Sequence, residues 1–231
     1  MTETMSIFER VEQVQARIAL ACERVGRSPE MVRLVAVSKK QPPEAVEEAA
    51  QAGLLLFGEN RVQEAMHKIP ECRGGVSWHL IGHLQTNKVK PAVQLFDMIH
   101  SVDSLRLLEA VNTACVAAGL TRQVLIQVNT AGERSKFGLA PEALEPLLES
   151  ATRLINVDIM GLMTMPPLTA DPEKVRTFFD ATRALRDRVS RSTGFALDEL
   201  SMGMSHDMEV AIEEGATFVR VGTDLFGKRR T

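Results

Sequence analysis

The chain of 231 residues carries a formal net charge of −3, and its 45% of hydrophobic residues is typical of a globular protein. Such a small charge creates no field that would attract nucleic acid or an anionic membrane. Three cysteines without paired spacing argue against a disulfide framework or a zinc site, and no apolar run reaches transmembrane length, so a cytoplasmic protein is predicted.

The first predicted element is an amphipathic helix over residues 5–25, where apolar side chains recur every three or four positions. Charged residues among these positions exclude a secretory signal. Short apolar runs typical of buried strands follow at Leu34–Val37, Leu54–Phe57, Trp78–Ile81, Met98–Val102, Val124–Val128, Val157–Met163, Leu200–Met202 and Phe218–Val221. Helical patterns separate most of these runs, at Glu44–Ala52, Arg61–Lys68, Ser104–Ala118, Pro141–Thr152, Pro172–Val189 and Asp207–Glu214.

This alternation indicates parallel strands joined by right-handed helical crossovers. Eight such units in 231 residues match a closed (β/α)8 barrel of the TIM type, with an extra N-terminal helix. A doubly wound open sheet is the alternative fold, but the dinucleotide signature G-x-G-x-x-G is absent. The Pro- and Gly-rich spots at 166–167 and 73–75 are single loops, so one domain over residues 1–231 is predicted.

A lysine, Lys39, directly follows the first predicted strand, and Pro42-Pro43 opens the next helix. In parallel barrels the carboxyl ends of the strands form the functional face. A partly desolvated lysine at this face is a competent amine nucleophile that forms a Schiff base with a carbonyl group. Taken alone, Lys39 is better explained as an exposed loop lysine, because most lysines are exposed.

Two segments after the last two strands have the composition of a phosphate site. Residues 201–205 (Ser-Met-Gly-Met-Ser) supply hydroxyls and a glycine, while Gly222-Thr223 lets the backbone approach a ligand and adds a hydroxyl. Barrels often bind phosphate with these loops and a short helix N-terminus, here beginning near Asp207. Ser205 and Asp207 would also serve as ordinary N-caps, but the coincidence of both segments favours phosphate.

Arg220 lies inside the last predicted strand, where a buried guanidinium needs an acceptor. One alternative is a structural ion pair with Glu59 or Asp224. The other is a hydrogen bond to the ring nitrogen of a bound heterocycle. A Schiff-base lysine, a phosphate cradle and an arginine facing a ring together describe pyridoxal 5′-phosphate (PLP).

Other polar residues give weaker signals. Asn60 fits a ligand contact or a helix cap, and His79 fits a satisfied core histidine or a ligand contact. Lys136 is more typical of an exposed loop lysine than of an accessory site at the barrel mouth. His83 and His206 are predicted in loops, and no spacing resembles a metal site. The methionines are mostly core filler: Met160, Met163, Met165, Met202 and Met204.

Together these segments resemble the pyridoxal phosphate homeostasis protein family, single-domain relatives of the alanine racemase barrel. The matching stretches follow one another along nearly the whole chain, at Val35–Lys39, Phe57–Asn60, Trp78–Gly82, Leu84–Lys88, Gly161–Met163, Leu200–Ser205 and Val219–Gly222. One departure is Arg61, at a position where this family often has an aromatic residue. The departure concerns any contact assigned to that aromatic ring and leaves Lys39 unaffected.

The resemblance implies a fold-type III barrel that carries PLP on Lys39, as a monomer without established catalysis. It places the phosphate near Ser201, Ser205, Gly222 and Thr223, and Arg220 at the pyridine nitrogen. The complete set of predicted cofactor-binding residues is Lys39, Asn60, His79, Ser201, Met204, Ser205, Arg220, Gly222 and Thr223.

The sequence contains no tyrosine, and this separates two classes of function. A racemase needs one base on each face of the substrate α-carbon, and in alanine racemases the second base is a tyrosine contributed across a dimer. An arginine at the ring nitrogen also keeps its proton, which leaves the pyridine a poorer electron sink, although true racemases share this feature. We therefore predict a carrier that buffers PLP as a Schiff base and serves intracellular PLP and amino-acid homeostasis, rather than an enzyme.

Two enzymatic alternatives use the same lysine. The first is a small PLP-dependent racemase or transaminase-like enzyme with Lys39 as the base, and the second is a phosphosugar aldolase with Lys39 as the Schiff-base lysine. The predicted partners of the carrier are PLP, pyridoxine 5′-phosphate and, transiently, PLP-dependent apo-enzymes, with no nucleic acid and no membrane.

Overall fold

The computed structural model describes residues 5–73, 75–133, 137–167 and 169–227. Its strands form a closed parallel barrel in chain order, and the last strand pairs with the first, with Ala36 opposite Val221. The predicted barrel is confirmed, and the open sheet is wrong. The strands are β1 (Arg33–Val37), β2 (Leu56–Glu59), β3 (Ser77–Leu80), β4 (Met98–Val102), β5 (Arg122–Gln127), β6 (Val157–Met163), β7 (Glu199–Met204) and β8 (Phe218–Val221).

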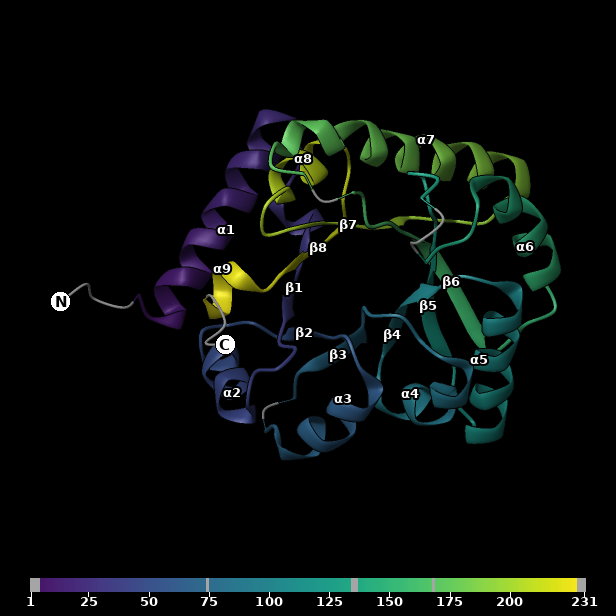
Figure 1. Ribbon diagram of the computed structural model, residues 1–231, viewed down its shortest axis with the longest axis horizontal. Coiled ribbons are helices and arrows are strands. Elements are labelled where there is room, and N and C mark those ends of the chain that lie inside the picture. The colour runs from purple at the N-terminus through teal and green to yellow at the C-terminus, as the bar shows by residue number, and fades with distance from the viewer. Residues whose placement is uncertain (1–4, 74, 134–136, 168, 228–231) are drawn as a thin grey trace.

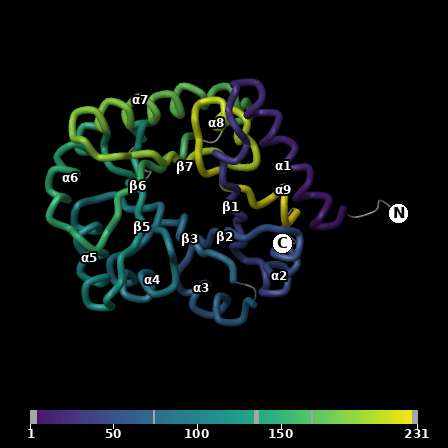
Figure 2. Tube along the Cα trace, turned by 180° about the vertical axis from the view of Figure 1, so that it is seen from behind, coloured from purple at the N-terminus to yellow at the C-terminus, as the bar shows by residue number. Residues whose placement is uncertain are grey.

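Helices surround the barrel as a ring (Figure 1), and the same order around the ring is seen from behind (Figure 2). The α-helices are α1 (Ile7–Arg24), α2 (Pro43–Gln51), α3 (Val62–Lys68), α4 (Val89–Leu95), α5 (Leu105–Ala118), α6 (Leu144–Ala151), α7 (Arg176–Thr193), α8 (Met208–Glu213) and α9 (Thr223–Phe226). Short 3-10 turns lie at Pro29–Met31, Ile69–Glu71, Thr86–Lys88, Pro141–Ala143 and Pro172–Val175. No helix within the described ranges combines the length and the apolar character needed to cross a membrane.

The second strand begins two residues later than predicted, at Leu56. Leu54 is buried, but its N–H donates to the carbonyl of Ala49 at 3.1 Å, which closes the end of α2. Gly53 makes this closure possible with a φ of +93°, a conformation that a side chain would disfavour. The apolar run therefore includes a helix cap as well as a strand.

The N-terminal helix α1 starts with a capping box, in which Ser6 and Glu9 bond each other's backbone N–H groups. Its buried stripe packs against α8 and α9, which flank the last two strands. Figure 1 shows α1 beside both of these short helices. The helix predicted over residues 5–25 thus covers the part of the barrel that holds the predicted phosphate turns.

The apolar core has two parts. A large cluster fills the space between the strands and the helices, and a small one lies inside the barrel around Val35, Met98 and Phe218. The barrel interior also buries polar side chains, among them His79, His100, Ser201 and Arg220, whereas Glu59 of β2 is buried on the outer face of the strand, against Lys68 of α3. Buried polar groups are costly unless they are paired, so their partners identify where the barrel is built for more than packing.

Candidate functional site

A cavity of about 270 Å³ lies at the carboxyl ends of the strands. Most of the predicted cofactor residues line it: Lys39, Asn60, Met204, Ser205, Arg220, Gly222 and Thr223. The other two, His79 and Ser201, are buried beneath it and do not form its wall. Residues from both ends of the chain therefore converge on one cavity, as the strand order of the barrel requires.

Lys39 occupies a tight turn directly after β1. It is half-buried and lines the cavity, so it is not a fully exposed loop lysine. The N–H of Gln41 donates to the carbonyl of Ser38 at 2.9 Å and closes the turn. Lys40 has a φ of +61°, the one positive φ among the described non-glycine residues. Such a conformation costs on the order of 1–3 kcal/mol, so other contacts must hold this turn.

A buried ion cluster lies against this turn. The ammonium of Lys68 donates to the carbonyl of Ser38 at 2.8 Å, to Oε1 of Glu59 at 2.7 Å and to Oε1 of Glu64 at 2.9 Å. The Ser38 hydroxyl donates to the same Glu59 oxygen at 2.7 Å. Burial raises the pKa of Glu59, while the hydrogen bonds from Lys68 and Ser38 act in the opposite direction.

Arg220 does not form the ion pair with Glu59 or Asp224 that was one of its two predicted alternatives. Glu59 is paired with Lys68, and Asp224 is paired with Arg17 of α1. Instead, the Arg220 guanidinium donates to Ser201 Oγ at 2.6 Å and to the carbonyl of Thr164 at 3.0 Å. Burial lowers the pKa of Arg220 to about 10, so the side chain is still a cation at neutral pH.

A chain of hydrogen bonds continues from Arg220 into the barrel. Ser201 Oγ lies 2.9 Å from His100 Nδ1, and His100 Nε2 lies 2.9 Å from His79 Nδ1. A guanidinium can only donate, so Ser201 accepts from Arg220 and can pass its own hydrogen to His100. Burial lowers the pKa of His79 to about 4 and that of His100 well below its usual value. Both rings are therefore neutral at pH 7, and the structure places His79 in the core.

This neutral pair predicts a pH dependence of stability. The pKa of His79 is about 4 in the folded chain and near 6.5 when unfolded, so the unfolded chain binds more protons between these values. Stability is full above about pH 6.5, and His79 alone accounts for a loss of roughly 3 kcal/mol as the pH falls to about 4. Urea unfolding across this range should show a shallower dependence in His79→Asn, which keeps a polar partner for His100 without titrating. Equal slopes in both proteins would contradict the prediction.

The two predicted phosphate turns lie next to each other. The N–H of Gly222 donates to Ser205 Oγ at 3.4 Å, and Asp207 Oδ1 accepts from the N–H of Met204 at 2.6 Å. Gly203 has a φ of +90°, and a Cβ there would lie 2.5 Å from the Cβ of Ala211 in α8. A glycine is therefore required between the predicted serines by the local backbone and by packing.

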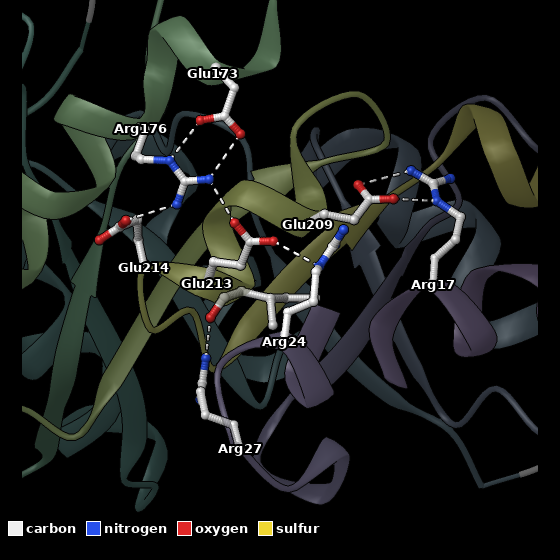
Figure 3. A network of polar contacts seen from close by, with 9 residues as sticks. Arg17, Arg24, Arg27, Glu173, Arg176, Glu209, Glu213 and Glu214 are labelled. Carbon is white, nitrogen blue, oxygen red and sulfur yellow. Dashed lines mark hydrogen bonds and ion pairs between the residues drawn. The ribbon is translucent and has the colours of Figure 1, made fainter. Parts of the chain in front are cut away.

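Arg17 of α1 connects the two predicted phosphate turns through its hydrogen bonds. It donates to the carbonyl of Ser205 at 3.0 Å, to Asp224 Oδ2 at 2.5 Å and to Glu209 Oε1 at 2.6 Å. Figure 3 shows Arg17 beside Glu209, within a wider set of ion pairs between α1, α7 and α8. The N-terminal helix thus holds the loop after β7 and the helix after β8 together.

Sequence reasoning missed four residues that support the cavity: Arg17, Lys68, His100 and Thr164. A signal existed for His100, a polar residue inside the apolar run Met98–Val102. Arg17 and Lys68 look like ordinary helix-surface charges until their partners are known. His83 and His206 lie outside the helices and strands, as predicted, and His206 lines the cavity. Lys136 lies outside the described residues.

Comparisons with known proteins find matches over nearly the whole length of this chain. The family model described as "Alanine racemase, N-terminal domain" matches residues 10–230. The pyridoxal phosphate homeostasis protein of Aquifex aeolicus is 46% identical over 98% of this chain and all of its own length. That of Pseudomonas aeruginosa is 44% identical over 97% of this chain and 96% of its own. PipY of Synechococcus elongatus, solved with PLP bound, is 38% identical and superposes with a TM-score of 0.86 over 96% of this chain and all of its own.

The identities, the nearly complete coverage in both directions and the shared barrel confirm the predicted resemblance. The chain therefore belongs to the pyridoxal phosphate homeostasis protein family and carries an alanine racemase N-terminal domain.

Proposed function

We propose that this protein binds PLP through Lys39 and holds it as a carrier that buffers the cofactor and serves PLP and amino-acid homeostasis. The observation that carries the proposal is the convergence of Lys39, Arg220 and the Ser205 and Gly222 turns on one cavity. The PLP-bound structure reported for a relative at 38% identity adds support.

The residues around the cavity fit the cofactor group by group. PLP offers an aldehyde, a phosphate and a pyridine nitrogen, and the cavity offers an amine, hydroxyl and N–H donors, and a guanidinium. Within the described part of the chain, Oδ1 of Asn60 is buried and accepts no hydrogen bond, although Asn60 lines the cavity. Arg220 is buried with no carboxylate partner among the described ion pairs, so a further acceptor would complete its surroundings.

When bound, PLP supplies an aldehyde that condenses reversibly with a primary amine. Lys39 provides that amine from a turn held against the cavity. Ser205 and the N–H groups of Gly222 and Thr223 would hold the phosphate and so orient the ring. Arg220 keeps its proton at neutral pH, because its pKa is about 10, and would donate to the ring nitrogen.

No tyrosine is present to serve as the second base of the racemase alternative. The titratable side chains that line the described wall of the cavity are Lys39, His206 and Arg220. Nε2 of His206 lies 3.2 Å from the carbonyl of Ala170. His79 and His100 are neutral and lie beneath the cavity. A carrier needs only capture and release, for which the present residues suffice.

Hydrogen exchange distinguishes the carrier from the enzyme. Purified protein loaded with PLP would be incubated with a panel of L-amino acids in deuterated water, with free PLP as the control. We expect exchange at the α-carbon no faster than with free PLP, together with restored activity when the loaded protein is mixed with an apo-aminotransferase. Rapid exchange with turnover would contradict the carrier.

Several further expectations stay predictions from the sequence. These are the single-domain organisation of residues 1–231, the monomeric state, the cytoplasmic location, binding of pyridoxine 5′-phosphate, and transient contact with PLP-dependent apo-enzymes. An absorbance spectrum addresses the aldolase alternative, because a band from a PLP imine that is lost in Lys39→Ala belongs to PLP and not to a sugar.

A further inference from the structure

Both neighbours of Lys39 are tied to one group of charged side chains, here called the Lys68 cluster and made of the buried Lys68 and Glu59 and the partly exposed Glu64. Lys68 is 6% exposed and Glu59 is fully buried. All three protons of the Lys68 ammonium have an acceptor, and these acceptors belong to three different segments of the chain. An ammonium saturated in this way has one geometry, so the segments that it joins are fixed relative to one another.

The cluster reaches the turn from both sides. On one side, Ser38 accepts from Lys68 through its carbonyl and donates to Glu59 through its hydroxyl. On the other side, the N–H of Lys40 donates to Oε1 of Glu64, the same oxygen that Lys68 bonds. These contacts hold Lys40 in its left-handed conformation, with a φ of +61°. Lys39 is the residue between the two attachments.

We infer that Lys68 is a positioning residue for Lys39. Lys68 acts through Glu59 and Glu64 to fix the Ser38–Lys40 turn with the Lys39 amine toward the cavity. This inference rests on the proposed function of Lys39 and deepens it. Apolar residues of similar volume often replace a buried ion pair without loss of stability. Stability alone is therefore a weak reason for charges at this place, whereas the geometry of the neighbouring nucleophile is a specific one.

Two ligands separate positioning from a general structural role. PLP needs the Lys39 amine, whereas pyridoxine 5′-phosphate has an alcohol in place of the aldehyde and uses only the phosphate and ring contacts. The test variant is Lys68→Met/Glu59→Gln, which removes the buried charges together and so avoids leaving one of them unpaired. Stopped-flow absorbance measures the rate of covalent reaction with PLP, and calorimetry measures the affinity for pyridoxine 5′-phosphate.

We expect the reaction of the double variant with PLP to slow by about tenfold or more, because small misplacements of a reacting group carry penalties of this size. Its affinity for pyridoxine 5′-phosphate should stay at the wild-type value. The matched control is Arg176→Met, which removes a cation of α7 that is bonded to Glu173 in the preceding 3-10 turn and to Glu213 and Glu214 at the end of α8, away from Lys39. This control should match the wild type with both ligands.

A second variant guards against failure of the first to fold. Glu64→Ala leaves the Lys68–Glu59 pair in place and removes the carboxylate that accepts from both the Lys40 N–H and Lys68, and a several-fold slower reaction with PLP is expected. A wild-type rate in either variant that folds would overturn the inference. A parallel loss of affinity for pyridoxine 5′-phosphate would overturn it as well. Failure of the proposed function itself is distinct, because the wild-type protein would then form no bond between Lys39 and PLP.

Discussion

Replacing Lys68 by methionine alone is expected to lower the free energy of unfolding by about 3–5 kcal/mol, because it leaves the carboxylate of Glu59 buried without its cation. Burial already raises the pKa of Glu59, and loss of Lys68 raises it further. When folding raises the pKa of a carboxyl group, the free energy of unfolding of the protein falls as the pH rises past the pKa that the group has in the unfolded chain. The deficit should therefore be larger near pH 8 than near pH 5, as urea unfolding at about these two pH values can measure.

Two control variants test whether the loss of stability expected for Lys68→Met comes from the unpaired Glu59 charge. Arg176→Met breaks ion pairs that are partly exposed, and screening by solvent limits its cost to about 1 kcal/mol. Lys68→Met/Glu59→Gln should recover part of the loss, because its remaining buried groups are neutral. A loss in Lys68→Met no larger than that in Arg176→Met would show that the Glu59 charge is not held by Lys68.

Replacing Gly82 by alanine is expected to cost about 1–3 kcal/mol or more and to lower the affinity for PLP. An added Cβ would lie 2.2 Å from the carbonyl oxygen of Asn60 and 2.7 Å from its Cα. These are backbone atoms, so they cannot rotate away, and the Ser101 hydroxyl holds the Gly82 carbonyl at 2.6 Å. The strain must displace Asn60, which lines the cavity.

The control for Gly82→Ala is Gly119→Ala, at the end of α5. Gly119 has a φ of +65° and no atom within 4 Å of an added Cβ, so only the backbone conformation penalises the change. It should cost about 1–2 kcal/mol and leave PLP binding as in the wild type. Thermal unfolding and calorimetric titration with PLP test both variants. Unchanged PLP affinity in Gly82→Ala would contradict the role given to the close contact with Asn60.

Local patterns were sufficient to predict most of the barrel. Each strand is a short apolar run, and each long helix has an apolar face that is visible within its own residues. Two helices were missed, α4 and α9. The first has seven residues with Pro91 among them, and the second has four residues, so neither shows a helical period over a sufficient length.

The candidate site likewise contains some residues that could be predicted from the sequence and others that could not. Lys39, Ser205 and Gly222 could be predicted, because the end of a strand is visible in sequence and the barrel brings these ends together. Lys68 could not, because a lysine in the last turn of a helix is usually solvated and favoured there by the helix dipole. Its burial depends on Ser38 and Glu59, which come from other elements. The partner of Arg220 was missed for a related reason, since Glu59 was already paired.

Reduction of the PLP-loaded protein with borohydride, followed by peptide mapping, tests the central claim most directly. Borohydride makes the bond between the cofactor and a lysine amine permanent, so the modified residue can be identified by mass. We expect the reduced cofactor on the peptide that contains Lys39, and none on that peptide in Lys39→Ala. A reduced cofactor on another lysine alone, or on none, would contradict the account.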